Sequence, residues 1–109
     1  VHGTETYHPG ILIATNPETN VRAVFEGTVT GIDFVPGYGT YLVIRHGDFL
    51  SVYSNFSTLF VAQGDDVSTG EVIGRSGTSN EPRGAGLFFA VFDKKKNTSV
   101  DPIGWLAQR

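Results

Sequence analysis

Histidine is the residue type in this sequence whose chemistry is most informative. The chain of 109 residues contains three histidines, His2, His8 and His46, and no cysteine. An imidazole nitrogen can bind zinc or exchange a proton near neutral pH. A catalytic zinc ion needs three protein ligands that supply nitrogen, oxygen or sulfur lone pairs, with one position left for water. Without cysteine, any zinc site here would have to combine histidine with carboxylates.

The charge of the chain argues against a nucleic-acid partner. The formal net charge is −3 and the isoelectric point is near 5.5, so there is no overall basic character. The only cluster of like charge is Lys94, Lys95 and Lys96, which is too short to follow a phosphate backbone. Because Asn97 and other turn residues follow directly, we expect these lysines to form a solvated hairpin tip.

The apolar segments are also too short to cross a membrane. The longest, residues 87–92, falls far below the roughly 20 residues that a spanning helix needs. No basic start followed by an apolar stretch marks a secretion signal after Val1. We therefore expect residues 1–109 to be one domain of a longer chain, without membrane insertion of its own, and any targeting segment to lie outside it.

Composition and turn spacing predict an all-β domain. Fourteen glycines and five prolines interrupt short runs rich in β-branched and aromatic residues. Seven such runs are candidate strands: residues 11–15, 21–25, 28–34, 41–46, 49–54, 71–75 and 87–93. This number of short strands favours an antiparallel sandwich or a partly open barrel. Gly47 and Asp48 predict a tight hairpin, and Asp101 before Pro102 predicts one short helix over 102–107.

Alternation assigns faces to the last long strand. One face carries Leu87, Phe89 and Val91, and the other carries Gly86, Phe88 and Ala90. Since both faces are largely apolar, the strand should contact a core on one side and line a half-open groove on the other.

The strand at 49–54 shows a similar contrast. Leu50 and Val52 point to one side, while Ser51 and Tyr53 point to the other. We expect Leu50 and Val52 to face the core and Tyr53 to face the groove.

A series of landmarks in one fixed order carries a family resemblance. They are His8-Pro9-Gly10-Ile11, Val21-Arg22-Ala23-Val24, Tyr38-Gly39, Leu42-Val43-Ile44-Arg45-His46, Tyr53, Gly70-Glu71-Val72-Ile73-Gly74 and Asp101-Pro102. From His8 to Leu106 this order resembles the LytM, or lysostaphin-type, family of zinc peptidases that cut peptide crosslinks in peptidoglycan. The resemblance implies a β-sandwich or partly open barrel with a substrate groove.

The same resemblance implies that the metal site is degenerate. In active members, zinc is held by the His and Asp of an H-x-x-x-D stretch and by the second His of an H-x-H pair, and two further histidines assist. Here His8 keeps the first position, but Leu12 stands at the Asp position, Gly86 and Phe88 replace the H-x-H pair, and Asn55 replaces the remaining histidine. The resemblance therefore implies no zinc, no other cofactor and no catalytic residue.

The vacated groove is then expected to bind a partner. The positions that resemble the substrate-facing ones are Tyr38, Tyr53, Asn55, Arg83, Phe88 and Ala90. Tyr53 and Phe88 could equally pack in a core, because aromatic residues at strand spacing often do. His8 is a former ligand, a groove contact or a histidine satisfied by the backbone. His46 is expected to be structural, and His2 to be exposed.

Among degenerate members, the EnvC-like class activates cell-wall N-acetylmuramoyl-L-alanine amidases during daughter-cell separation. By this resemblance the chain would bind and activate such an amidase in the bacterial cell envelope, in a periplasmic or extracytoplasmic location. Two alternatives remain open: an inactive module that binds peptidoglycan or has a structural role in an envelope assembly, and an enzyme that uses different ligands.

Overall fold

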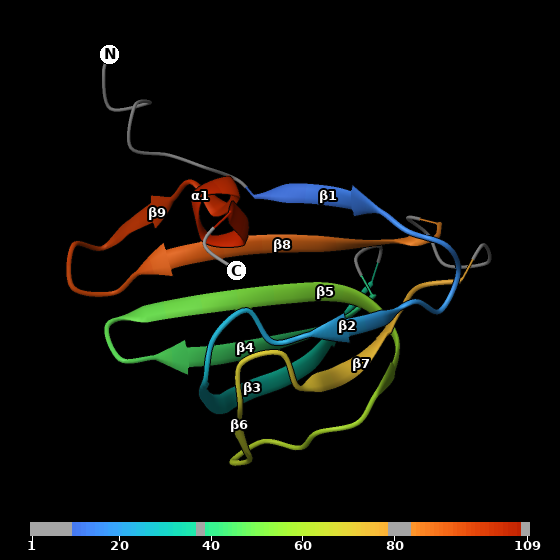
Figure 1. The fold of residues 1–109 in the computed structure, drawn as a ribbon, viewed down its shortest axis with the longest axis horizontal. Coiled ribbons are helices and arrows are strands. Elements are labelled where there is room, and N and C mark those ends of the chain that lie inside the picture. The colour runs from blue at the N-terminus through green and yellow to red at the C-terminus, as the bar shows by residue number, and fades with distance from the viewer. Residues whose placement is uncertain (1–9, 37–38, 79–83, 108–109) are drawn as a thin grey trace.

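The structure, a computed structural model, describes residues 10–36, 39–78 and 84–107 (Figure 1). The described part of the chain forms nine strands and one helix. They are β1 (Ile11–Ala14), β2 (Asn20–Arg22), β3 (Gly27–Val35), β4 (Gly39–His46), β5 (Phe49–Leu59), β6 (Asp66–Val67), β7 (Val72–Ser76), β8 (Gly86–Asp93), β9 (Thr98–Val100) and α1 (Pro102–Ala107). The predicted all-β class, the seven predicted strands and the helix are confirmed. The short strands β6 and β9 were not predicted, because two or three residues carry no readable alternation.

Six of the strands follow one another in an antiparallel sheet in the order β1-β8-β5-β4-β3-β6. The longest strand, β5, lies between β8 and β4 over residues 49–54. From Phe56 to Leu59 it pairs with β7, with a register shift between Phe56 and Thr58. Strand β7 pairs in turn with β2. Figure 1 shows β2 and β7 in front of β3 and β4, so the chain folds back as a second layer over one face of the main sheet.

The core fills the space between these layers. It is built from buried side chains of both: Val21, Ala23, Val24, Val29, Leu42, Ile44, Tyr53, Phe56, Val67, Ile73, Leu87, Phe89 and Val91. The faces predicted for β8 are confirmed, because Leu87, Phe89 and Val91 are buried whereas Phe88 and Ala90 are only partly so.

The faces predicted for β5 are wrong. Tyr53 is 1% exposed and Ser51 is fully buried, whereas Leu50 and Val52 are half-buried on the opposite face. The Tyr53 hydroxyl accepts a hydrogen bond from the Val24 backbone N–H at 3.1 Å, and the Ser51 hydroxyl bonds the His46 ring. These side chains can enter the core because their polar atoms are satisfied there.

Helix α1 closes one end of the core. Its start is capped as predicted, since the Asp101 carboxylate accepts a hydrogen bond from the Ile103 N–H at 3.0 Å. The Trp105 ring packs against Phe25 and Phe49, with centroid distances of 5.1 and 5.3 Å. No helix in the described residues has the length and apolar character that crossing a membrane would take.

Both predicted hairpin tips are present. Gly47 has a φ of 66°, which suits the first loop position of a type II′ hairpin between β4 and β5. The lysine turn between β8 and β9 is exposed, and the Asp93 carboxylate accepts hydrogen bonds from the Lys95 and Lys96 backbone N–H groups. This turn is therefore a solvated connection, as its sequence predicts.

Replacing Tyr53 by Phe should lower the free energy of unfolding by about 1–3 kcal/mol, because the Val24 N–H would lose its acceptor in a buried place. Urea denaturation followed by circular dichroism measures the change. Tyr41→Phe is the matched control, since Tyr41 is only half-buried. Equal effects of the two substitutions would contradict a structural role for the Tyr53 hydroxyl.

Candidate functional site

Two positions at which the family resemblance expects metal ligands, Leu12 and Phe88, lie on the face of the main sheet that the described residues leave uncovered. Leu12 in β1 lies directly opposite Phe88 in β8, and Phe88 lies directly opposite Ser54 in β5. Directly paired residues of antiparallel strands share a face of the sheet. Leu12 is 53% exposed, and the Phe88 ring reaches towards Gly10, where an added Cβ would lie 2.7 Å from the ring. The positions at which the family resemblance expects these two ligands are thus occupied by adjacent apolar side chains.

The side chains at these positions do not fit zinc. Neither Leu12 nor Phe88 carries a lone pair that could bind a metal ion, and Gly86 offers no side chain. In the part of the chain that the structure describes, no three His, Asp or Glu side chains gather closely enough to hold an ion. His8 lies outside the described residues, as do Tyr38 and Arg83.

A shallow apolar depression continues from Phe88 across the sheet. It has a volume of about 410 Å³ and is lined by Val35, Tyr41, Val43, Val52, Ser54 and Phe88. Ala90 lies opposite Val52 on this face and is half-buried. We call this depression the groove. It contains Phe88, as the sequence predicts, and Ala90 lies beside it on the same face.

Two other predicted groove residues are not on this surface. Tyr53 faces the core, as described above, and Asn55 is fully buried. The Asn55 side-chain amide donates hydrogen bonds to the carbonyl oxygens of Gly84 and Gly86, both at 3.0 Å. Its φ of 79° is a left-handed conformation that asparagine tolerates better than most residues. The structure therefore corrects both predictions: Tyr53 packs in the core, and Asn55 ties the middle of β5 to the start of β8.

Sequence reasoning missed most of the groove floor. Val35, Tyr41, Val43 and Val52 were not predicted to contact a partner. The signal was present in β4, where Tyr41 and Val43 alternate with the buried Leu42 and Ile44, so both faces of the strand are apolar. An apolar second face on a central strand indicates either another packed layer or a binding surface.

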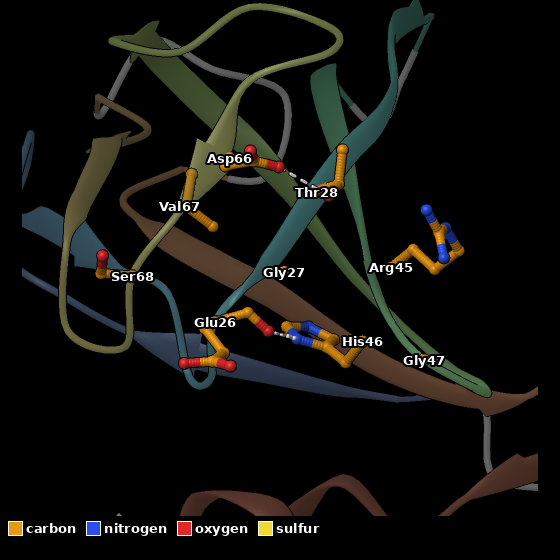
Figure 2. A pocket seen from close by; sticks show the side chains of 9 residues that line it. All are labelled: Glu26, Gly27, Thr28, Arg45, His46, Gly47, Asp66, Val67 and Ser68. Atoms are coloured by element: carbon orange, nitrogen blue, oxygen red, sulfur yellow. Dashed lines mark hydrogen bonds between the residues drawn. The ribbon is translucent and has the colours of Figure 1, made fainter.

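A second cavity, of different chemistry, lies at the other end of β4. It has a volume of about 450 Å³ and is lined by Glu26, Gly27, Thr28, Arg45, His46, Gly47, Asp66, Val67 and Ser68 (Figure 2). Figure 2 shows Asp66 joined to Thr28 and the His46 ring joined to the Glu26 backbone. We call this cavity the polar pocket.

His46 borders the polar pocket but has a structural role, as predicted. Its Nδ1 lies 2.7 Å from the Glu26 carbonyl oxygen, which can only accept, so Nδ1 carries the proton. Its Nε2, at 2.7 Å from the Ser51 hydroxyl, then accepts a hydrogen bond from that hydroxyl. Burial lowers the pKa of His46 below its ordinary value, and the hydrogen bond to Glu26 opposes this only in part. Both ring nitrogens of neutral His46 are thus satisfied inside the fold.

Comparisons with known proteins identify the family to which the sequence is similar. The model of a family described as peptidase family M23 matches residues 6–102. The murein hydrolase activator EnvC of Escherichia coli is 29% identical over 100 residues, which cover 91% of this chain and 23% of EnvC. The lipoprotein NlpD of Yersinia enterocolitica is 34% identical over 94 residues, which cover 83% of this chain and 86% of that protein. This chain thus spans about a quarter of the length of EnvC.

One solved structure illustrates the similarity of fold. The catalytic domain of lysostaphin from Staphylococcus simulans superposes with a TM-score of 0.80 at 26% identity. The superposition covers 92% of this chain and 79% of the lysostaphin chain. The sheet that carries the groove therefore has the architecture of a lysostaphin-type domain.

We expect the purified chain to hold no stoichiometric zinc, because Leu12 and Phe88 offer no metal-binding atom. Elemental analysis after dialysis measures the zinc content, and a chelator should leave the melting curve unchanged. One tightly held zinc per chain, whose removal abolishes a hydrolytic activity on peptidoglycan, would contradict this expectation.

Acidification should destabilise the fold through His46. Because its folded pKa is lowered, the folded state binds the proton less readily than the unfolded state does. The stabilisation is complete above the unfolded pKa of about 6.5 and declines as the pH falls through 6.5 towards the folded pKa. Urea denaturation at pH 7.5 and at pH values below 6.5 measures the slope. His46→Gln should remove this part of the slope, and an unchanged slope in that variant would assign it to another group.

Proposed function

The chain belongs to peptidase family M23, and we propose that it acts within this family by binding a protein partner in its apolar groove rather than by hydrolysis. The partner that we propose is a cell-wall N-acetylmuramoyl-L-alanine amidase, which the chain activates in the bacterial cell envelope, on the periplasmic or extracytoplasmic side. The similarity to EnvC, which is named a murein hydrolase activator, supports this proposal.

The observation that carries the proposal is the apolar floor of the groove. Leu12 and Phe88 stand where the family resemblance places metal ligands, and the apolar surface continues from Phe88 through Val52 and Val43. Exposed contiguous apolar surface on a soluble domain commonly marks an interaction site. A floor of this kind provides apolar area for a partner and provides no group that could activate water.

The chemistry of the floor also favours one form of partner segment. The groove lies over β4, β5 and β8, whose backbone groups pair with neighbouring strands. An extended peptide laid across it would find few free backbone groups, and each unsatisfied N–H or C=O that it buried would cost about 1–3 kcal/mol. An α-helix satisfies its own backbone and presents apolar side chains on one face. We therefore propose that the amidase contributes an amphipathic helix to the groove.

Activation then follows from differential binding. An amidase that exchanges between an inactive and an active arrangement is shifted towards the arrangement whose helix is free to dock. The chain needs no catalytic group for this role. Its affinity for the exposed helix sets how far the equilibrium moves.

An amidase assay on purified peptidoglycan, with and without this chain, tests the proposal. Each amidase of the same cell is assayed alone and with the chain, and a pull-down with isolated sacculi is run in parallel. Faster product release by one amidase supports activation. Binding to sacculi without any effect on an amidase would instead support an inactive peptidoglycan-binding module, and hydrolysis by the chain alone would support an enzyme.

Truncation of the groove floor should weaken amidase binding. Phe88→Ala and Val52→Ala should each cost about 1–3 kcal/mol of binding free energy, because both side chains line the groove. The free energy of unfolding should change less than for a core truncation, since both side chains are only half-buried. Calorimetric titration with the amidase and urea denaturation give the two quantities.

Two control variants separate binding from folding. Leu42→Ala, on the buried face of β4, should lower the free energy of unfolding by about 2–5 kcal/mol. Lys95→Ala, in the exposed turn after β8, should change neither quantity. Unchanged affinity of the two groove variants would move the binding surface elsewhere.

A further inference from the structure

We propose that the polar pocket is a second binding site, for a short zwitterionic peptide with a free ammonium group at one end and a carboxylate at the other. The pocket is lined mainly by polar and charged side chains, whereas the groove is lined by apolar ones. Its volume of about 450 Å³ lies within the range of small-ligand sites. Because the two surfaces differ in chemistry, this site does not depend on the proposed amidase partner.

Opposite charges flank one residue on the same face of the sheet. Asp66 in β6 lies directly opposite Thr28 in β3, and Thr28 lies directly opposite Arg45 in β4. Directly paired residues share a face, so the carboxylate and the guanidinium stand on either side of the Thr28 hydroxyl. Figure 2 shows Thr28 between Asp66 and Arg45.

Both charged groups keep free bonding capacity. The Asp66 Oδ1 accepts a hydrogen bond from the Thr28 hydroxyl at 2.8 Å, which orients the carboxylate. Among the described residues, nothing pairs with the Asp66 Oδ2 or with the Arg45 guanidinium, and both side chains are exposed. An ammonium group can therefore bind at Asp66 while a carboxylate binds at Arg45. The planar guanidinium of arginine favours bidentate hydrogen bonds with a carboxylate.

The spacing of these charges selects the length of the ligand. Asp66 and Arg45 are two strands apart, so their Cα atoms are separated by roughly 10 Å. Three extended residues span roughly 10 Å between their ends. A tripeptide with free termini therefore reaches both charges at once. A single amino acid, whose two charged groups sit on one carbon, cannot.

Other ligand classes fit the pocket less well. Phosphate would be attracted by Arg45 but repelled by the carboxylates of Glu26 and Asp66, which line the same pocket. A divalent cation would need more oxygen ligands than gather here, since no three acidic or histidine side chains cluster in residues 10–36, 39–78 and 84–107. A small peptide with separated charges is the class that uses both signs of charge in the pocket.

Titration of the isotope-labelled chain with trialanine, followed by two-dimensional NMR in low-salt buffer, tests the proposal. We expect shifts concentrated at the amides of Gly27, Thr28, Gly47 and Ser68, which line the pocket. Acetylating the amino terminus of trialanine, or amidating its carboxyl terminus, should weaken binding about tenfold each, because each change removes one charge-assisted contact. Alanine itself should bind more weakly than trialanine.

Arg45→Gln and Asp66→Asn should each weaken trialanine binding about tenfold. Arg45→Gln should not further weaken binding of the amidated peptide, which already lacks the carboxylate, and Asp66→Asn should not further weaken binding of the acetylated peptide, which already lacks the ammonium group. Lys95→Gln and Asp33→Asn remove the same charges at exposed positions outside the pocket and should have no effect. Absence of shifts at the pocket, or equal binding of trialanine and its blocked forms, would overturn the proposal. Amidase activation plays no part in this measurement, so its outcome is independent of the groove.

Discussion

The architecture depends on one feature of the central strands: β4, β5 and β8 are largely apolar on both faces, and the described residues cover only one of these faces. The layer formed by β2 and β7, together with α1, packs on the face that carries Leu42, Tyr53 and Phe89. The opposite face, with Val43, Val52 and Phe88, is left open. Burying apolar surface stabilises the fold by about 25 cal/mol per Å². The open face has not gained this stabilisation within the described chain, and a partner can supply it.

Asn55 has a structural role in the fold. The family resemblance places a histidine there, but the asparagine amide bonds two backbone carbonyls at the start of β8 and is sealed from solvent. Its Oδ1 is buried without a hydrogen-bond partner among the described residues. An unpaired buried acceptor costs free energy, so the two amide hydrogen bonds and the φ of 79° must be held by the surrounding sheet. This arrangement fixes the end of β8 that delivers Phe88 to the groove.

Much of the fold was predictable from the sequence because turn residues and alternation are local signals. Glycines and prolines separate the strands, Asp101 marks the start of the helix, and the alternation of β8 assigns its faces correctly. The faces of β5 were not predictable in the same way. Ser51 and Tyr53 are polar at their tips, so alternation alone places them outside, yet His46 and the Val24 N–H satisfy them inside the core. These partners lie in β4 and in the segment between β2 and β3, so the sequence of β5 alone does not contain them. The groove floor was missed for a different reason: the apolar second face of β4 can be read from its sequence, but that face alone does not distinguish a packed layer from a binding surface.

The order of residues along β4 places the groove and the polar pocket next to each other. Tyr41, Val43 and Arg45 alternate on the uncovered face, so the surface changes from apolar to charged over about 14 Å of strand. Apolar area gives affinity with little dependence on salt, whereas the Arg45 guanidinium and the Asp66 carboxylate act through charges that salt screens. A change of ionic strength therefore separates the two surfaces: binding at the groove should be nearly constant while binding at the polar pocket weakens. Because one antiparallel sheet carries both surfaces, a single ligand could contact both of them only by extending along β4 from one to the other.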